Sequence, residues 1–399
     1  MMDALTQPAT RAPAAPLDDA LVFVSDPDSE GVIRHALGDL GVARAEFTPG
    51  TIDTAIAQLA HRPSPRLLVA DITGIEDPAA RTDALAAVCE PGTGVVLIGE
   101  VNDVRVYRDL KSVGVAEYFF KPLVNDLLKR SFSGVFSGTV YQANSRTGKL
   151  VIALGVRGGS GATMIAATAA WHLSEVLQRR VALVDLDFQF GDAALQFDAA
   201  PSHALTEALQ HPDRVDDLFL ERGIIRVSDR LALLASLEPI GATAMPDEAA
   251  ILSLLDTLLR RYRYVFVDLP PMLAPRLMRV LHLPGTVLFV STGNLVCARD
   301  AGRWRDAIGA NTAERTVMRI LNRSGAHGSL TPEEFARVSG HALDMIIPYS
   351  REVGLASNMG IRAVHKCGSL KRELAPLLRH LAGEAVAGSR PSLFHRMFG

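Results

Sequence analysis

Short, continuous runs of apolar residues alternate along the chain with longer stretches of helical spacing. In the first part of the chain such runs occupy residues 21–24, 66–70, 94–98 and 116–120. Runs of this length, apolar at nearly every position, are typical of strands buried on both faces of a parallel sheet, and the stretches between them supply the covering helices. The pattern therefore predicts an α/β domain in this part of the chain.

A second series of the same kind begins at residue 150. Polar residues, among them Asp185, Asp268 and Asn322, stand just beyond the carboxyl ends of its apolar runs. Because open α/β sheets bind ligands at that edge, the second series predicts a ligand site there. Together the two series predict an α/β fold with two doubly wound parallel-sheet domains. The apolar runs of the second series are residues 150–154, 181–184, 231–235, 264–267, 286–290 and 317–321, and residues 164–177 have helical spacing.

Composition along the chain suggests where the domains begin and end. Residues 132–148 are rich in serine, glycine and threonine without a clear period, which predicts a linker. Residues 1–18 are rich in alanine and proline and lack the pattern of a secretory signal, so we expect a disordered leader. The first domain is then expected at 19–131, the second at 149–386, and a C-terminal tail at 387–399.

Overall composition narrows the functional classes. The 399 residues carry a formal net charge of −3, which excludes a diffuse basic surface for nucleic acid. The three cysteines, Cys89, Cys297 and Cys367, are far apart and odd in number. That pattern disfavours a disulfide framework or a zinc site and fits a reducing cytoplasm.

A glycine-rich loop lies between the run at 150–154 and the helix that follows it. Residues 155–163 read G-V-R-G-G-S-G-A-T, and such a loop can turn backbone N–H groups and a helix N-terminus toward phosphates. The P-loop pattern ends in Gly-Lys-Ser/Thr, whereas Gly161 is followed here by Ala162 and Thr163. The alternative for the loop alone is a glycine turn that only packs a helix against a sheet.

Two strand ends favour the nucleotide interpretation. The sequence V-A-L-V-D-L-D places Asp185 and Asp187 at one strand end, and Y-V-F-V-D places Asp268 at another, in the Walker B form. With the hydroxyl of Thr163, these carboxylates supply the parts of a magnesium–nucleotide site. We therefore expect Thr163, Asp185 and Asp268 to hold Mg²⁺.

This constellation resembles the ParA/MinD superfamily of deviant Walker ATPases. The superfamily loop K-G-G-x-G-K-T corresponds to R-G-G-S-G-A-T here, and V-D-L-D-F-Q-F-G-D-A-A-L and V-F-V-D-L-P-P resemble its CpaE/TadZ branch of Flp/Tad pilus assembly proteins. The resemblance covers almost the whole chain, including a receiver-like, flavodoxin-like domain before the P-loop domain. It implies a cytoplasmic homodimer that organises pilus machinery or polar scaffold proteins at the cell pole, near the inner membrane.

The resemblance also implies roles for individual positions. Arg157 stands where the signature lysine reaches across a dimer to the partner's nucleotide. Asp185 would help to hold magnesium water and Asp187 would position the attacking water. Asn322 and Pro348 would lie near the adenine base. The remaining nucleotide-binding positions are Gly158, Gly159, Ser160, Gly161, Ala162 and Thr163.

We expect the absence of the P-loop lysine to weaken hydrolysis more than nucleotide binding. A P-loop lysine is a point charge against the phosphates, and its loss weakens stabilisation of the transition state. Arg157 would compensate in part, because a guanidinium matches phosphate oxygens; a solvated loop arginine is the alternative. We expect ATP and Mg²⁺ to bind with weak or absent hydrolysis.

The first domain resembles an atypical response-regulator receiver. Asp71 ends a strand where the phosphoacceptor belongs, and Lys121 follows an aromatic strand as in receivers. One member of the acidic pair is missing at Ser25-Asp26, with Asp28 as the alternative carboxylate, and Gly99 stands at the switch position of a serine or threonine. We expect a pseudo-receiver used for docking or dimerisation, with phosphorylation of Asp71, assisted by Asp26 and Lys121, as the alternative.

Two surface features weigh on the choice of function. Arg299, Arg303 and Arg305 form a basic cluster, which we expect to be a solvated helix face rather than a DNA-binding surface. The last residues, S-L-F-H-R-M-F-G, loosely resemble a membrane-binding tip but predict only marginal membrane affinity. The loop favours a nucleotide-dependent dimer scaffold for pilus assembly. The alternative is an active ParA/MinD-like ATPase switch in partitioning or division-site positioning.

Overall fold

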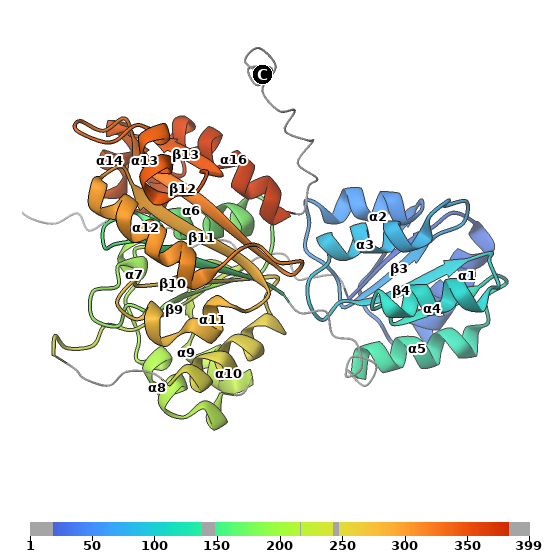
Figure 1. Cartoon of the computed structure of the whole chain (residues 1–399). Helices are drawn as coiled ribbons and strands as arrows, with labels where there is room; N and C mark the ends of the chain where they lie inside the picture. Colours follow the sequence, from blue (N-terminus) through green and yellow to red (C-terminus); the bar gives the residue numbers. More distant parts are fainter. Residues whose placement is uncertain (1–18, 138–147, 216, 242–246, 383–399) are drawn as a thin grey trace, which may run out of the picture.

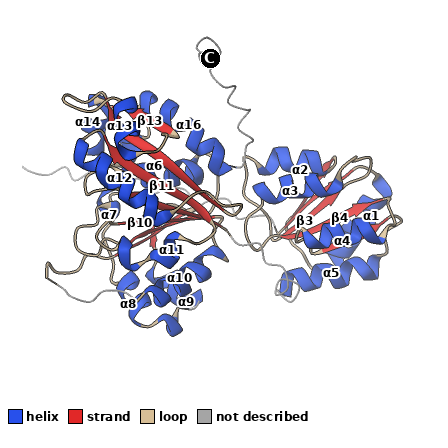
Figure 2. Ribbon diagram, in the orientation of Figure 1, coloured by secondary structure: helices blue, strands red, loops and turns tan. Residues whose placement is uncertain are grey.

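Two parallel-dominated sheets, each covered by helices on both faces, make up the computed structural model (Figures 1 and 2). The structure describes residues 19–137, 148–215, 217–241 and 247–382. The predicted leader, nearly all of the linker beyond Ser137, and the predicted tail lie outside the described residues. The α/β fold class with two doubly wound parallel-sheet domains is confirmed.

The first sheet has five parallel strands in the order β2-β1-β3-β4-β5. All residues of β1, β3 and β4 are buried, which is why these strands appear in the sequence as continuous apolar runs. Strand β2 was not predicted, because it lies at the edge and none of its residues is fully buried. The strands are β1 (Ala20–Val24), β2 (Ala45–Pro49), β3 (Leu67–Asp71), β4 (Gly94–Gly99) and β5 (Glu117–Phe120).

Helices cover both faces of this sheet. On one face α1 (Pro27–Asp39) and α5 (Asn125–Ser137) share a buried core, and on the other lie α2 (Ile52–Leu59), α3 (Pro78–Val88) and α4 (Val104–Ser112). The predicted start of the linker is wrong, because α5 continues to Ser137. Its residues Phe132 and Val135 are 0% and 4% exposed in the core, so residues 132–137 belong to the domain.

The second sheet has eight strands in the order β13-β12-β11-β6-β10-β7-β9-β8, all parallel except β8, which is antiparallel to β9. Strands β8 and β13 were not predicted; they are short and lie at the two edges. The strands are β6 (Lys149–Gly155), β7 (Val181–Asp185), β8 (Ile225–Arg226), β9 (Leu231–Ala235), β10 (Tyr264–Leu269), β11 (Gly285–Thr292), β12 (Arg315–Ser324) and β13 (Met345–Pro348).

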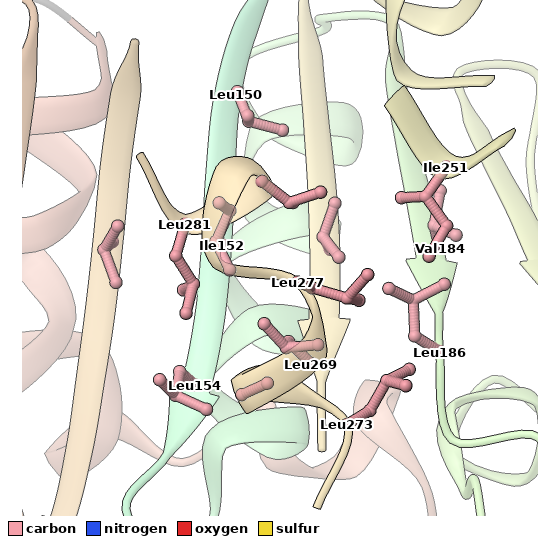
Figure 3. Packing of buried hydrophobic residues seen from close by; sticks show 14 of the residues in the cluster. Leu150, Ile152, Leu154, Val184, Leu186, Ile251, Leu269, Leu273, Leu277 and Leu281 are labelled. Atoms are coloured by element: carbon pink, nitrogen blue, oxygen red, sulfur yellow. The ribbon is translucent and has the colours of Figure 1, made fainter. Parts of the chain in front are cut away.

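Central strand β6 shows how the second core is built. Leu150, Ile152 and Leu154 point to one face, where they meet Leu277 and Leu281 (Figure 3), because successive side chains of a strand alternate between faces. The helices on that face are α8 (Ala204–Gln210), α9 (Asp217–Gly223), α10 (Glu248–Leu259), α11 (Met278–Leu281), α12 (Leu295–Ile308) and α13 (Pro332–Ser339).

The opposite face of β6 carries small and branched residues. Val151 and Ala153 pack there against the alanine-rich α6 (Ala162–Glu175), which follows the glycine loop. The other helices of this side are α7 (Ala193–Gln196), α14 (Arg351–Ser357), α15 (Ile361–Val364) and α16 (Gly368–Ala382). Within the described parts of the chain, none of the helices has the length and apolar character needed to cross a membrane.

Candidate nucleotide-binding site

The glycine-rich loop connects the carboxyl end of β6 to the N-terminus of α6. Gly159 and Gly161 have φ angles of 78° and 89°, in the left-handed region that favours glycine. At Gly161 an added Cβ would also lie 2.5 Å from Nδ2 of Asn322. Ala162 occupies the first position of α6, and no side chain caps this helix N-terminus. The uncapped backbone N–H groups can therefore hold an anion.

Asn322 fastens this loop to β12. Its Nδ2 donates to the carbonyl of Ser160 at 2.8 Å, and its Oδ1 accepts from the backbone N–H of Arg323 at 2.9 Å. The side chain of Arg323 donates to the carbonyl of Gly159 at 3.3 Å. The structure thus places Asn322, which is 2% exposed, against the phosphate loop. Its contact with an adenine base stays a prediction.

Two buried carboxylates lie beside the loop. Asp185 is the last residue of β7 and Asp268 the last but one of the neighbouring β10, and the register of the two strands pairs them directly. Burial raises the pKa of Asp185 to about 6. Burial, followed by the charge of Asp185, raises the pKa of Asp268 well above its ordinary value, although Thr163 donates a hydrogen bond to it. The structure therefore brings the three predicted magnesium-binding residues together.

The donor set fits a magnesium ion. Among the described residues no cation pairs with Asp185 or Asp268, and the charges that act on the two acids come from other acids, Asp187 and Asp192 among them. Among the described residues there is no group of three or more histidine, cysteine or acidic side chains that could hold a metal. Mg²⁺ commonly binds through one or two carboxylates together with substrate phosphates and waters, which is what this arrangement offers.

Asp187 lies at the mouth of the same pocket. Its backbone N–H donates to Asp185 at 3.0 Å, and its own carboxylate accepts from the N–H of Phe190 at 3.0 Å. The turn needs Gly191, because an added Cβ would lie 2.4 Å from the carbonyl oxygen of Asp187. These contacts hold Asp187 near the loop, in a position compatible with the predicted orientation of water.

The predicted nucleotide-binding residues line one open cavity of about 1270 Å³. Its lining includes loop residues 157–163, Asp187, Asp268, Asn322 and Pro348. Ligand pockets commonly measure about 300–1,000 Å³, so the cavity is large enough for a nucleoside triphosphate.

Arg157 belongs to the loop and lines the cavity, but its guanidinium is bound by an acid of its own chain. Its guanidinium forms an ion pair with Asp300 of α12, while half of its side chain (52%) remains exposed. The hydrogen bond from Arg299, together with that from Arg157, lowers the pKa of Asp300, although burial acts in the opposite direction. Sequence reasoning missed Asp300; the signal was an acidic residue inside a run of arginines.

The arginines of the predicted basic cluster all lie close to acids of α12. Arg299 and Arg303 both lie near Asp300, at 2.8 and 3.8 Å, and Arg305 pairs with Asp306 at 2.7 Å. Acids on α12 therefore offset these arginines, in agreement with the expectation that they do not form a DNA-binding surface.

In the first domain, Asp71, Asp26 and Lys121 also come together as predicted. Asp71 ends β3 with 0% exposure. Nζ of Lys121 lies 2.7 Å from Asp71 and 2.6 Å from Asp26. The hydroxyl of Ser25 and both donors of Thr73 bind the Asp71 carboxylate as well. Burial raises the pKa of Asp71, but these hydrogen bonds outweigh it and lower the pKa below the ordinary value.

Hydrogen-bond donors of Ser25, Thr73 and Lys121 occupy both oxygens of the Asp71 carboxylate. Ser25 occupies the position of the second acid that a receiver needs for magnesium. At the switch position, a Cβ on Gly99 would lie 2.9 Å from Ile72 and 3.0 Å from the hydroxyl of Tyr118, so these side chains fill the space of a switch residue. The pseudo-receiver interpretation and the alternative of phosphorylation at Asp71 both stay predictions.

Known proteins resemble different parts of the chain. A family model described as cellulose biosynthesis protein BcsQ matches residues 149–299. A solved ParA family ATPase from Chlorobium tepidum TLS is 23% identical, with a TM-score of 0.52, and the match covers 59% of this chain and 100% of that chain. This likeness confirms the fold expected for the second domain. No curated protein sequence matches the chain significantly.

Two solved pilus assembly proteins share more sequence over a shorter length. The protein CpaE from Caulobacter crescentus CB15 is 30% identical, and the match covers 29% of this chain and 97% of that chain, with a TM-score of 0.27. A putative CpaE2 from Sinorhizobium meliloti 1021 is 31% identical, covering 30% and 99% of the two chains, also with a TM-score of 0.27. In each comparison the match spans nearly the full length of the solved pilus protein but less than a third of this chain.

Proposed function

We propose that this chain, which belongs to the CpaE family of pilus assembly proteins within the ParA/MinD superfamily, is a nucleotide-dependent dimer scaffold for pilus assembly with weak or no hydrolysis. One observation carries the proposal: the buried pair Asp185 and Asp268 lies beside a glycine-rich phosphate loop that lacks the P-loop lysine. Maintaining two buried acids side by side is costly unless a cation binds between them.

The residues present fit ATP with Mg²⁺. The backbone N–H groups of residues 158–161 and the N-terminus of α6 would hold the phosphates. Thr163, Asp185 and Asp268 would hold Mg²⁺, which supplies positive charge against the phosphate oxygens when bound. Asn322 would stabilise the conformation of the loop through its hydrogen bond to the carbonyl of Ser160.

Slow turnover follows from two features of the loop. Ala162 removes the charge that a P-loop lysine places against the phosphates, and Arg157 is engaged by Asp300 in the same chain. A site that binds nucleotide without efficient hydrolysis is suited to holding a complex together. Release of Arg157 toward a second subunit would connect nucleotide binding to dimer formation.

Asp187 keeps the second candidate open. Its position at the pocket mouth favours residual hydrolysis and hence an active ParA/MinD-like ATPase switch. Turnover separates the two functions, because a switch needs hydrolysis on the time scale of its cycle and a scaffold does not.

Partners and location complete the proposal. We infer a homodimer in the cytoplasm, at the cell pole near the inner membrane, that positions pilus assembly components or a polar scaffold protein. The acids of α12 argue against DNA as a partner. Any marginal membrane contact would come from residues 387–399, outside the described residues.

The function is tested by replacing the chromosomal gene with Thr163→Ala or Asp268→Asn and following pilus number and a fluorescent fusion. We expect fewer pili and loss of the polar focus, with protein levels unchanged. Asp306→Asn, an exposed acid of α12, serves as the control. Normal pili and a normal focus in both site variants would contradict a nucleotide-dependent scaffold.

A further inference from the structure

Arg179 of the second domain is buried against the first domain. It lies just before β7, is 6% exposed, and donates to three backbone carbonyls. These are the carbonyls of Leu59 at 2.7 Å, Ala60 at 3.0 Å and Val88 at 2.7 Å. Leu59 and Val88 are the last residues of α2 and α3, and Ala60 is the C-cap of α2. One guanidinium therefore binds the C-terminal ends of two helices at once.

This contact has a clear electrostatic basis. The last carbonyls of a helix have no partner within the helix and carry the negative end of its dipole. A guanidinium presents several donors in a fixed plane, so it can serve two adjacent helix ends that a lysine could satisfy only in part. Because α2 and α3 end side by side, their free carbonyls form a natural receptor for Arg179.

Two further contacts extend the junction. Arg263, also 6% exposed, lies just before β10 and donates to the carbonyl of Ala87 in α3 at 2.9 Å. Glu90, just after α3, is 8% exposed and accepts from the backbone N–H of Arg180 at 2.9 Å. Burial raises the pKa of Glu90, while the charges of Arg179, Arg180 and Arg263 act against that shift.

The contacts enter the second domain at one place. Arg180 and Arg263 immediately precede Val181 and Tyr264, which pair in the register of neighbouring strands β7 and β10. The carboxyl ends of the same two strands carry Asp185 and Asp268. The first domain therefore binds the amino edge of the sheet (Figure 1). The nucleotide pocket is lined by residues at the carboxyl ends of the strands, among them Asp268.

The first domain, like the second, contributes the amino edge of its sheet to the interface. Helices in a parallel α/β domain run antiparallel to the strands, so the C-terminal ends of α2 and α3 lie at the amino edge of its sheet. Asp71 ends β3 at the carboxyl edge. The junction thus leaves both carboxyl edges, with the Asp71 cluster and the nucleotide pocket, away from the interface.

We propose that Arg179, with Arg263 and Glu90, forms a buried clamp that docks the receiver-like domain on the amino ends of β7 and β10 of its own chain. Arg179 and Arg263 of the second domain bind the C-terminal ends of α2 and α3, so the partner of this surface is the chain's own first domain. The clamp keeps the receiver-like domain in a fixed position, so that it and the nucleotide pocket present their carboxyl edges as one assembly.

The test uses the full-length protein without nucleotide, so its outcome is independent of the proposed function. In Arg179→Ala we expect a larger radius of gyration in small-angle scattering and faster hydrogen exchange at the ends of α2 and α3. We also expect trypsin to separate the two domains about tenfold faster, because loss of these charge-assisted hydrogen bonds raises the fraction of molecules with an open junction. Arg260→Ala, an exposed arginine of the same domain, is the matched control and should leave all three readouts unchanged.

Two milder variants keep the proposal testable should Arg179→Ala not fold. Arg179→Lys retains the charge but loses the planar donors and should give an intermediate effect. Glu90→Gln retains the acceptor for Arg180 and should open the junction less than Arg179→Ala. Wild-type scattering, exchange and cleavage in the folded Arg179 variants would overturn the clamp, as would a switch from dimer to monomer, which would place the contact between chains.

Discussion

Arg157 of the phosphate loop is bound by Asp300, which lies on α12 of the same chain. The loop arginine is therefore engaged before any nucleotide or second subunit arrives. Asp300 also receives Arg299 and Arg303, so it remains partnered when Arg157 leaves. Under the proposed function, nucleotide phosphates would compete with Asp300 for this guanidinium, and the balance between them would set the affinity of the site.

Releasing Arg157 should strengthen nucleotide binding. We expect Asp300→Asn to bind ATP with Mg²⁺ several-fold more tightly in calorimetric titration, because the guanidinium is then free to meet the phosphates. Arg157→Ala should bind more weakly, and the double variant should match Arg157→Ala. Asp306→Asn is the control on the same helix. Weaker binding in Asp300→Asn than in the wild type would show that Asp300 supports the site instead of restraining Arg157.

Restoring the missing lysine should restore hydrolysis. Loss of one well-placed donor to a developing charge commonly reduces kcat by about 10²–10³. We expect Ala162→Lys to raise the ATPase rate at least tenfold, measured as phosphate release at saturating ATP. Ala162→Met, similar in length and uncharged, is the control. Equal rates in the two variants would mean that the lysine charge is not what limits turnover.

The buried acids should cost stability when no cation is bound. With the pKa of Asp185 raised to about 6, the carboxyl is charged at pH 7 beside Asp268, and the folded state loses stability as pH rises through that value. Asp268→Asn removes the repulsion. We expect a higher melting temperature than the wild type in EDTA and no further rise with MgATP. A lower melting temperature in EDTA would contradict the account of an unbalanced acidic pair.

The sequence predicted those strands and site residues whose signal lies within a few neighbouring positions of the chain. Strands such as β7 and β10 are buried on both faces and therefore leave continuous apolar runs, whereas edge strands β2, β8 and β13 leave little signal. Asp185 and Asp268 were found because each follows such a run directly.

Contacts between distant residues left no comparable pattern. Arg157 and Asp300 are 143 positions apart, and nothing near either residue in the chain marks the other as its partner. Arg179 binds backbone carbonyls, which every residue possesses, so its partners cannot be recognised from side-chain identity. The role of Asn322 at the loop likewise depends on the approach of β12, which only the tertiary structure shows.

The receiver-like domain should not accept a phosphoryl group. Lys121, Ser25 and Thr73 already satisfy Asp71, and a second magnesium-binding acid is missing from this cluster. Treatment with acetyl phosphate and Mg²⁺, followed by intact-mass analysis, should give no stoichiometric adduct. A phosphoryl group at Asp71, lost in Asp71→Asn, would overturn the pseudo-receiver interpretation.

One histidine should make stability fall in mild acid. Burial, aided by Lys371 and His172, lowers the pKa of His365 to about 4. Because the unfolded histidine titrates near pH 6.5, the unfolded state binds the extra proton first, and stability falls as pH drops from about 6.5 to 4. In urea unfolding, His365→Gln should show a flatter dependence over this range, and the exposed His35→Gln should not. A wild-type slope in His365→Gln would assign the effect elsewhere.

Calorimetric titration of the wild-type protein with ATP and Mg²⁺, with phosphate release followed in the same samples, tests the central claim most directly. The account predicts saturable, magnesium-dependent binding that is lost in Asp268→Asn, together with little or no turnover. No binding at millimolar ATP would contradict the nucleotide site, and fast hydrolysis by the wild-type protein would contradict its use as a scaffold.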